Sequence, residues 1–501
     1  MRIAHLSAEA SPFAKAGGLG DVVGSLPVAQ ARLGHEVCVW MPFYRQARAE
    51  LRRRGLAAQR ESEAFEVGLG GVREPVTLWR ASLPGGEVPV RLVEADRFFN
   101  RTHLYGLAPD GRDDGLVRFA CLVRGALEGM QRLGKVPDVL HVHDWHTALA
   151  PMALAWDRGR YPGFSDTVTV LTIHNLAYQG VFGPEDFDYL GLPALRLPAL
   201  MWNGALNLLK AGLLTATEVT TVSPTFAWEI TTPEGGFGLG PILRHRVGEL
   251  AGIVNGIDTE VWNPATDPRI PLRYSADDLD GKLEDRRTLL TMAGMDADRP
   301  GLVVGMIGRL TVQKGYELLL PVLDELLADG IRFVLLGSGD AHIEERFRLH
   351  ARESKGKFWA HLGFDDPLAH LIEAGADAFL MPSLFEPCGL NQLYSLAYGT
   401  PPIVRRVGGL ADTVVGYDGS NADHATGFSF DAAEPTALRD TVRWAARCHR
   451  DRELWRRLMR NGMSQDFSWR KSAERYVEVY RRAARRARSR WATAPATLPI
   501  L

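Results

Sequence analysis

The sequence predicts an α/β protein with two parallel sheets, one in each half of the chain. Short β-branched or apolar runs alternate with longer helical patterns throughout, which is typical of βαβ units. At 501 residues, 46% hydrophobic and 24% charged, the chain is too long for one hydrophobic core. We therefore expect two domains, each built around its own sheet.

The strands fall into two series. In the first half, strands are predicted over residues 2–7, 35–41, 88–92, 138–143, 168–173 and 218–222. The second series begins after Trp262 and comprises residues 301–307, 332–336, 358–362, 378–381 and 402–405. A loop or a helical stretch follows each strand of the first series, as a parallel sheet requires.

The segment between the two series predicts a short, tight connection. AGIVNGIDTEVWNP carries Asn-Gly and Asn-Pro breakers but no long polar linker. We expect an N-terminal domain over 1–250 and a C-terminal domain over 251–468, joined over a cleft. Residues 469–501 are expected to form a packing helix with a frayed end. Its apolar face is Trp469, Ala473, Tyr476, Val477, Tyr480 and Ala484.

Charge and cysteine usage exclude several classes of protein. The 58 basic and 60 acidic residues nearly cancel, so no global field attracts nucleic acid or an anionic membrane. Four scattered cysteines without CxxC spacing fit a reducing cytosol. The sequence contains no long uncharged apolar run, so we expect neither a membrane span nor a signal peptide. We expect a cytoplasmic protein; its oligomeric state stays open.

An arginine-rich run ends the last predicted helix. It is interpreted as a solvated helix face, with an anionic partner as the alternative. Its members are Arg481, Arg482, Arg485, Arg486, Arg488 and Arg490.

A glycine-rich turn follows the first strand. Gly17-Gly18-Leu19-Gly20-Asp21 precedes a helical pattern, and its backbone N–H groups can converge on an anion. The same pattern is also that of a plain tight turn. Lys15, two residues upstream, favours a phosphate site.

Two cations follow the first strand of the second series. Arg309 and Lys314 stand beyond its carboxyl end, where α/β sheets bind ligands. A forked guanidinium and a movable ammonium would suit a diphosphate. The alternative is a pair of solvated loop charges.

A carboxylate, Glu386, lies in PSLFEPCGLNQ between a strand and a helix. It is either a helix cap or an acceptor of sugar hydroxyls, and position alone leaves both open. In the second case the N–H groups of Cys388, Gly389 and Leu390 would donate to the same ligand.

The run His141-Val-His143-Asp144-Trp145-His146 allows three interpretations. Zinc is disfavoured because no distant fourth ligand is indicated. Carbohydrate contacts are favoured, since Trp145 is of the type that stacks on sugars. Structural hydrogen bonding is the remaining alternative. His174 and Asn175 form a second polar pair at a strand end.

Taken together, these motifs resemble the bacterial glycogen synthase (starch synthase) family, in the family's order over nearly the whole chain. They are KAGGLGD from Lys15, HVHDWH from His141, TIHNLAYQG from Thr172, NGID from Asn255, GRLTVQKG from Gly308, PSLFEPCGLNQLYSLAYGT from Pro382 and GGLADTV from Gly408.

The resemblance implies a GT-B architecture, in which two Rossmann-like domains face each other across a cleft and the last helix crosses back to the first domain. It implies retaining transfer of glucose from ADP-glucose to the non-reducing end of an α-1,4-glucan such as glycogen. We expect no metal and no other cofactor, because fixed cations and amides would stabilise the leaving diphosphate.

Residue roles follow from the same resemblance. The implied catalytic set is Lys15, His174, Arg309, Lys314 and Glu386. The implied donor site adds Gly18, Asn255, Phe364, Cys388, Gly389, Leu390, Asn391, Gly408 and Gly409, with Phe364 as the adenine platform. The implied acceptor residues are Tyr105, Asp144 and Trp145.

Two departures from the family pattern keep alternatives open. Ala16 and Val407 stand where the family commonly has Thr. They leave open a catalytically silent glucan- or nucleotide-sugar-binding protein. Asn391 and Phe364, which bear on the nucleotide preference, leave open a UDP-glucose-using glucosyltransferase.

Overall fold

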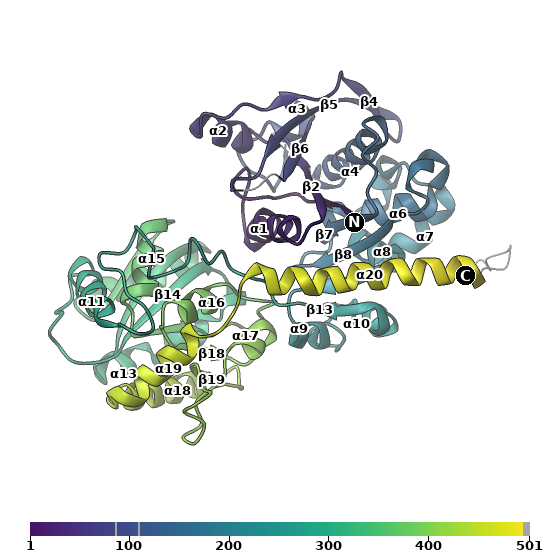
Figure 1. The fold of residues 1–501 in the computed structure, drawn as a ribbon. Helices are drawn as coiled ribbons and strands as arrows, with labels where there is room; N and C mark the ends of the chain where they lie inside the picture. Colours follow the sequence, from purple (N-terminus) through teal and green to yellow (C-terminus); the bar gives the residue numbers. More distant parts are fainter. Residues whose placement is uncertain (86–87, 109–110, 494–501) are drawn as a thin grey trace. The chain divides into compact units, whose positions relative to one another are not determined.

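The computed structural model describes residues 1–85, 88–108 and 111–493 (Figure 1). The chain divides into two compact units. Unit 1 contains residues 1–222, 227–256 and the segment from Trp469 onward; unit 2 contains 223–226 and 257–468. The predicted tail lies, from residue 494 on, outside the described residues.

The short segment 223–226 departs from the single boundary that we expected near residue 250. It belongs to unit 2 because its side chains are bonded there. The Ser223 hydroxyl donates to the Pro387 carbonyl oxygen at 2.6 Å, and the Thr225 hydroxyl donates to the Asp412 carboxylate at 2.7 Å.

Unit 1 is built on a largely parallel sheet with β1 (Arg2–Leu6) at its centre. Its strand order is β13-β12-β8-β7-β1-β2-β6-β5-β3, with β4 paired to β5. The inner strands are almost wholly buried, as expected where helices cover both faces. The parallel strands are β2 (Glu36–Pro42), β6 (Pro89–Glu94), β7 (Val139–His143), β8 (Val168–Ile173), β12 (Glu218–Thr221) and β13 (Leu250–Gly252).

An antiparallel edge was not predicted. β4 (Phe65–Leu69) and β5 (Val72–Ser82) form a hairpin, and β5 also pairs with β6 and with β3 (Gln59–Arg60). Burial alternates along β5, which indicates one solvated face. At the turn Gly70 has φ +63°, and a Cβ there would lie 2.4 Å from the Asp188 carbonyl oxygen. The signal was present in the alternating sequence and the Gly-Gly turn.

The C-terminal helix α20 (Trp469–Thr493) belongs to unit 1. It packs against α1 (Gly18–Arg32) and β8, and Figure 1 shows it as the long yellow helix beside that sheet. Tyr476 and Tyr480 are fully buried in the core that α20 shares with α1. Ala484 is only partly buried.

The other helices of unit 1 cover the sheet or connect its strands. They are α2 (Arg45–Arg53), α3 (Asp96–Phe99), α4 (Gly115–Arg132), α5 (Asp144–Thr147), α6 (Leu149–Trp156), α7 (Leu197–Leu200), α8 (Leu208–Thr215) and α10 (Gly240–His245). α9 (Pro224–Glu229) begins in unit 2, and a small sheet contains β9 (Val181–Phe182), β10 (Met201–Trp202) and β11 (Ala205–Asn207).

Unit 2 contains a parallel sheet of six strands in the order β16-β15-β14-β17-β18-β19. The strands are β14 (Val303–Leu310), β15 (Arg332–Gly339), β16 (Phe358–Leu362), β17 (Ala378–Met381), β18 (Pro402–Arg405) and β19 (Phe428–Phe430). The flanking helices are α11 (Asp280–Met292), α12 (Tyr316–Leu319), α13 (Leu323–Ala328), α14 (Ala341–Glu353), α15 (Asp366–Gly375), α16 (Asn391–Ala397), α17 (Gly408–Thr413), α18 (Pro435–Cys448) and α19 (Arg452–Met463).

β14 and β15 each extend three residues beyond the predicted ends. Gly308 pairs with Gly337, and Arg309 pairs with Ser338, so the ladder continues into the glycine turns. Arg309 therefore stands on a strand and not on a loop.

Across the described ranges, no helix is long and apolar enough to cross a membrane. All four cysteines are free thiols.

The arginine run of α20 is partly used inside the protein. Arg482 and Arg486 both pair with Glu218, whose side chain is fully buried at the start of β12, and Arg486 also pairs with Glu249. The two proposed interpretations, a solvated face or an anionic partner, are thus wrong for these two residues. Arg481, Arg485 and Arg488 are exposed, and the Arg490 side chain lies outside the described part.

We predict that Glu218→Gln lowers the free energy of unfolding by about 3 kcal/mol, because it removes the buried anion that two arginines share. Urea unfolding followed by far-UV circular dichroism measures the loss. Arg485→Gln, which changes an exposed arginine of the same helix, is the control and is expected to have no effect. Equal stability of the two variants would contradict the anchoring role.

Candidate active site

The carboxyl ends of β14 and β17 bring together most of the predicted donor residues. Lys314 Nζ lies 2.6 Å from Glu386 Oε2, and the Ser383 hydroxyl donates to the same oxygen at 2.9 Å. Glu386 is only 5% exposed. Glu386 makes no side-chain cap of α16, so the capping interpretation is wrong.

Arg309 lies on the strand before this pair. Its side chain is exposed, and within the described ranges it has no ion pair or side-chain hydrogen bond, in contrast to Lys314. An exposed, unpaired guanidinium beside a lysine–carboxylate pair leaves one full positive charge available to an anion.

Close backbone contacts hold the loops of this site together. Gly315 has φ +68°, and a Cβ there would lie 2.0 Å from the Pro382 carbonyl oxygen. Any side chain at 315 would therefore push the Lys314 loop away from the Glu386 loop. Asn391 joins the same cluster, since its side-chain amide donates to the Ile307 carbonyl oxygen at 2.6 Å.

Gly408 and Gly409, the first two residues of α17, are placed differently from the expectation. The Gly409 N–H donates to the Glu386 carbonyl oxygen at 3.0 Å, so this amide is already engaged within the protein. A Cβ at Gly409 would lie 2.1 Å from the Cys388 carbonyl oxygen, so this glycine serves close packing. α16 and α17 have 7 and 6 residues, which gives their dipoles little weight in binding an anion.

The other predicted donor residues of unit 2 follow the carboxyl ends of β16 and β17 in the sequence. Cys388 is buried, and Leu390 precedes α16 with Gly389 before it at φ +75°. Phe364 is 89% exposed just after β16, an unusual position for a large apolar ring and one suited to stacking. No contact of Phe364 with the Lys314–Glu386 pair is seen in the described part.

In unit 1 the glycine-rich turn is hydrogen-bonded to the carboxylate of Glu9, which the sequence analysis did not identify. Glu9 accepts hydrogen bonds from the N–H groups of Ala16 (2.7 Å) and Gly17 (3.1 Å) and from the Tyr105 hydroxyl. Burial raises the pKa of Glu9. The Gly17 amide is thus not free for phosphate, contrary to the expectation.

Lys15 and Gly18 lie at the same turn. Lys15 Nζ is 2.6 Å from the Asp21 carboxylate, and both side chains are partly exposed. Gly18 is the first residue of α1. Lys15, like Lys314, is therefore held by a carboxylate.

Asp144 and His174 meet at the carboxyl ends of β7 and β8. The backbone N–H of His174 donates to Asp144 Oδ1 at 2.7 Å. Asp144 has φ +54°, in the left-handed region. Burial raises the pKa of Asp144 to about 7. Such a carboxyl exchanges a proton near neutrality.

Trp145 is packed beside a shallow pocket. Its ring lies against Phe182 and stacks on His146 with centroids 4.2 Å apart. A pocket of about 340 Å³ is lined by Trp145, Phe182 and residues 177–181. A Cβ at Gly180 would lie 2.5 Å from the Trp145 ring, so this glycine lets the chain pass the indole.

Asn255 carries an unused acceptor. It is 5% exposed, and its Oδ1 is buried with no hydrogen-bond partner in the described part of the chain. A buried carbonyl oxygen without a donor is costly, which favours a ligand hydroxyl there.

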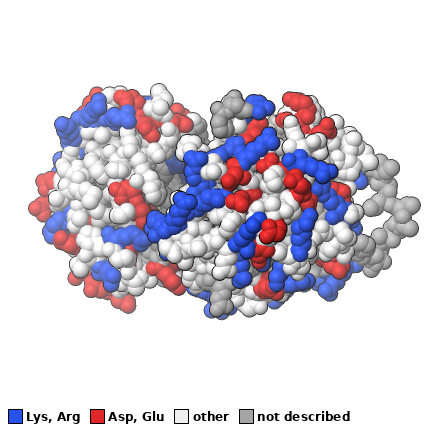
Figure 2. Space-filling model, turned by 90° about the horizontal axis from the view of Figure 1, so that it is seen from above, with Lys and Arg blue, Asp and Glu red and all other residues white. Residues whose placement is uncertain are grey.

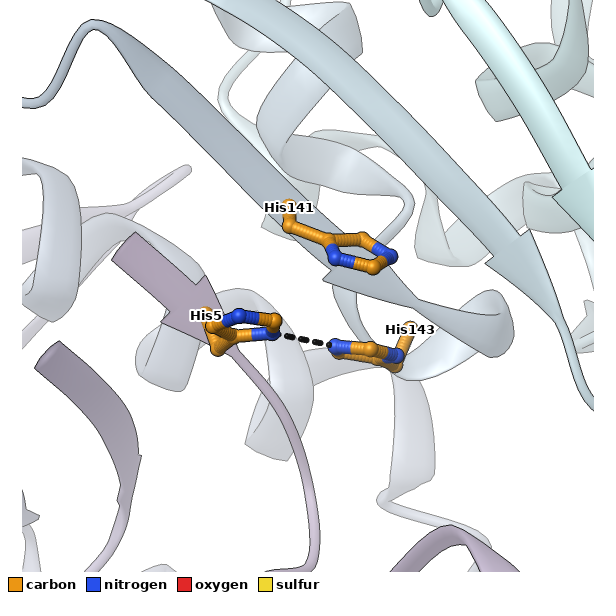
Figure 3. Close-up of side chains that lie close together, drawn as sticks. All are labelled: His5, His141 and His143. Atoms are coloured by element: carbon orange, nitrogen blue, oxygen red, sulfur yellow. Dashed lines mark hydrogen bonds between the residues drawn. The ribbon is translucent and has the colours of Figure 1, made fainter. Parts of the chain in front are cut away.

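Three buried histidines lie close together in unit 1. His5, His141 and His143 have the proximity of a candidate metal centre, and Figure 3 shows the bond between His5 and His143. Each of their ring nitrogens, however, already has a partner within the protein. His141 and His143 are fully buried, so carbohydrate contact is wrong for these two, and structural hydrogen bonding accounts for them.

Two α/β units of parallel topology, with cations, glycines and a carboxylate at the carboxyl ends of their strands, define a GT-B glycosyltransferase. Residues 2–245 match the starch synthase catalytic domain, and residues 296–463 match glycosyl transferases group 1.

Curated relatives agree over nearly the full length. The chain is 47% identical to a glycogen synthase of Anaeromyxobacter sp. (strain Fw109-5), covering 97% of this chain and 100% of that one. It is 44% identical to glycogen synthase 2 of Geobacter metallireducens, covering 97% and 99%. The chain thus belongs to the glycogen synthase (starch synthase) family, and it is a glycosyltransferase.

Solved structures support the same fold. The catalytic domain of starch synthase IV from Arabidopsis thaliana, bound to ADP and acarbose, matches with a TM-score of 0.86 and 34% identity, covering 96% of this chain and 99% of that one. A sucrose-phosphate synthase from Thermosynechococcus elongatus has a TM-score of 0.58 and 19% identity, covering 96% and 98%, and supports the fold alone.

We predict that Asp144 makes stability depend on pH. The folded chain holds this proton up to about pH 7, whereas an unfolded aspartate loses it near pH 3.9. The stabilisation is present below about pH 4 and is lost as the pH rises through about 7. Asp144→Asn, which tolerates the positive φ, is expected to lack this component.

Urea unfolding of wild type and variant at about pH 5 and about pH 8 measures the difference. Asp166→Asn, at an exposed position, is the control. Identical pH dependence in wild type and Asp144→Asn would contradict the assignment.

Proposed function

We propose that the chain transfers glucose from ADP-glucose to the non-reducing end of an α-1,4-glucan, with retention of configuration and release of ADP. The observation that carries the proposal is the Lys314–Glu386 pair beside the unpaired Arg309. The glycogen synthases among the relatives and the starch synthase bound to ADP and acarbose support the choice of donor and acceptor.

The reaction requires stabilisation of a departing diphosphate. As the glycosyl–phosphate bond lengthens, negative charge grows on the diphosphate and positive charge on the anomeric carbon. Arg309 offers a fork of donors, and Lys314 can leave Glu386 for the phosphate. Glu386 is then free to accept the glucose hydroxyls. We propose that these fixed charges act without a divalent metal.

For unit 1 we propose roles along the same lines. Lys15 and Gly18 act on the donor, and His174 and the orphaned Asn255 oxygen accept hydrogen bonds from hydroxyls of the sugar. Asp144, Trp145 and, through Glu9, Tyr105 serve the acceptor. In unit 2, Phe364 stacks on the adenine, and Cys388, Gly389, Leu390, Asn391, Gly408 and Gly409 shape the sugar pocket.

Retention is proposed to arise from a same-face substitution. An oxygen of the leaving phosphate takes the proton of the acceptor hydroxyl, and that hydroxyl oxygen bonds to the anomeric carbon on the face that the phosphate leaves. Glu386 is the strong carboxylate candidate for the alternative, double displacement, but its bonds to Lys314 and Ser383 suit a hydroxyl anchor better. A glucosyl adduct on Glu386, detected by mass spectrometry, would overturn the same-face route.

We expect Lys314→Ala and Arg309→Ala to lower kcat by about 10²–10³-fold, because each removes a preorganised charge from the transition state. Release of ADP from ADP-glucose in the presence of glycogen measures the rate. Lys355→Ala, an exposed lysine after α14, is the matched control and is expected to keep full activity. Full turnover by Lys314→Ala would contradict the proposed role of Lys314 in stabilising the leaving diphosphate.

Two comparisons distinguish the alternatives. We expect ADP release that depends on glycogen; a silent binding protein would bind the nucleotide sugar without releasing ADP. We also expect faster transfer from ADP-glucose than from UDP-glucose, and the reverse order would select the UDP-glucose alternative.

The metal-free mechanism has its own test. We expect turnover to be unchanged after dialysis against EDTA. Loss of activity that Mg²⁺ restores would show that cations of the protein do not suffice. We also propose that the enzyme works in the cytosol, which the four free thiols support.

A further inference from the structure

A continuous chain of side-chain hydrogen bonds connects His174 to the C-terminal helix. His174 Nε2 lies 3.0 Å from His143 Nδ1, and His143 Nε2 lies 3.1 Å from His5 Nδ1 (Figure 3 shows the second contact). His5 Nε2 lies 2.8 Å from Gln30 Oε1, and Gln30 Nε2 donates to the Tyr480 hydroxyl at 2.9 Å. The chain thus begins at the edge of the candidate site and ends on α20.

All the links between these ends are shielded from solvent. His5, Gln30 and His143 are fully buried, and so is Tyr480. Burial lowers the pKa of His5 to about 4 and of His174 to about 3, and it also lowers that of His143. Each ring is therefore neutral at pH 7, with one nitrogen that donates and one that accepts.

The amide of Gln30 determines which nitrogen donates. Its oxygen accepts from His5 Nε2, so His5 Nδ1 carries no proton and accepts from His143 Nε2. The same rule makes His143 Nδ1 accept from His174 Nε2. His174 is left with Nδ1 unprotonated, as a hydrogen-bond acceptor.

A second branch fits the same orientation. Tyr480 receives a hydrogen bond from Gln30 and donates to His141 Nδ1 at 2.7 Å. His141 Nε2 then donates to Thr172 at 2.6 Å, and the Thr172 hydroxyl donates onward to Thr220 at 2.6 Å. Both branches are satisfied by one amide orientation, and reversing that amide would reverse every bond in them.

We propose that Gln30 and Tyr480 are positioning residues that hold His174 in the tautomer whose Nδ1 accepts a hydrogen bond from a sugar hydroxyl. The consequence for activity rests on the proposed function, in which His174 contacts the donor sugar. The tautomer itself does not, because it follows from hydrogen bonds between residues of the chain. Through Tyr480, α20 thereby influences the chemistry of His174, which lies at the end of β8.

The first test reads the tautomer directly. In protein labelled with ¹⁵N at the histidine rings, the two nitrogens of a neutral ring have well-separated shifts for the protonated and the bare nitrogen. His174→Gln identifies the His174 signals. We expect Nε2 protonated and Nδ1 bare in His5, His143 and His174; a proton on His174 Nδ1 would overturn the proposal.

The second test removes the links. Tyr480→Phe and Gln30→Met each delete hydrogen-bonding atoms with little change in shape. We expect either variant to give a mixture of His174 tautomers and to lower kcat/KM for ADP-glucose about tenfold, with KM for glycogen unchanged. Unchanged tautomers in both variants would overturn the proposal.

Tyr476→Phe is the matched control. It removes one buried hydroxyl from the same helix, four residues before Tyr480, and that hydroxyl makes none of the bonds described above. We expect wild-type spectra and rates within about twofold. An equal loss in Tyr476→Phe and Tyr480→Phe would assign the effect to packing alone and overturn the proposal.

The tautomer of His174 and its effect on activity are tested separately. In a His174→Gln background, Tyr480→Phe is expected to cause no further loss of kcat/KM, since its effect acts through that ring. A wild-type enzyme without ADP-glucose activity would contradict the proposed function, while the ¹⁵N shifts would still decide on the tautomer.

Discussion

Parallel strand pairing is the constraint on which the candidate site depends. Because neighbouring strands run in one direction, their carboxyl ends meet at one edge of each sheet. In unit 2 this edge collects Arg309 at the end of β14, and Glu386 after β17. In unit 1 it collects Asp144 after β7 and His174 after β8. No local sequence feature could place these residues together without the sheets.

Charged groups at both edges are paired before any ligand binds. Lys15 is held by Asp21, and Lys314 by Glu386. Such pairing keeps long side chains ordered, and in the proposed reaction an incoming diphosphate would exchange one anionic partner for another. Arg309 differs, because within the described chain it is exposed and has no such partner. In the proposed reaction both cations act on the diphosphate, Arg309 directly and Lys314 after it leaves Glu386.

Prediction from the sequence succeeded where periodicity is strong. The bounds of β8 and β17 match the predicted ranges residue by residue, since buried parallel strands are short continuous apolar runs between breakers. The β4–β5 hairpin was missed although its sequence alternates, because Glu74 places a charged residue on the buried face of β5. Glu9 was missed for another reason: its partners Ala16, Gly17 and Tyr105 become visible only when the turn is folded. The contacts of Gln30 with Tyr480 span 450 positions, a separation that no local pattern encodes.

The membership of α20 in unit 1 has a consequence for the order in which the protein is completed. The core of the first unit includes Trp469, Tyr476 and Tyr480, which leave the ribosome after all of unit 2. Unit 2 needs nothing beyond Ser468 and is free to fold during synthesis, whereas the unit that begins the chain waits for its end. During that interval the apolar surface that α20 covers in the folded protein stays exposed to solvent.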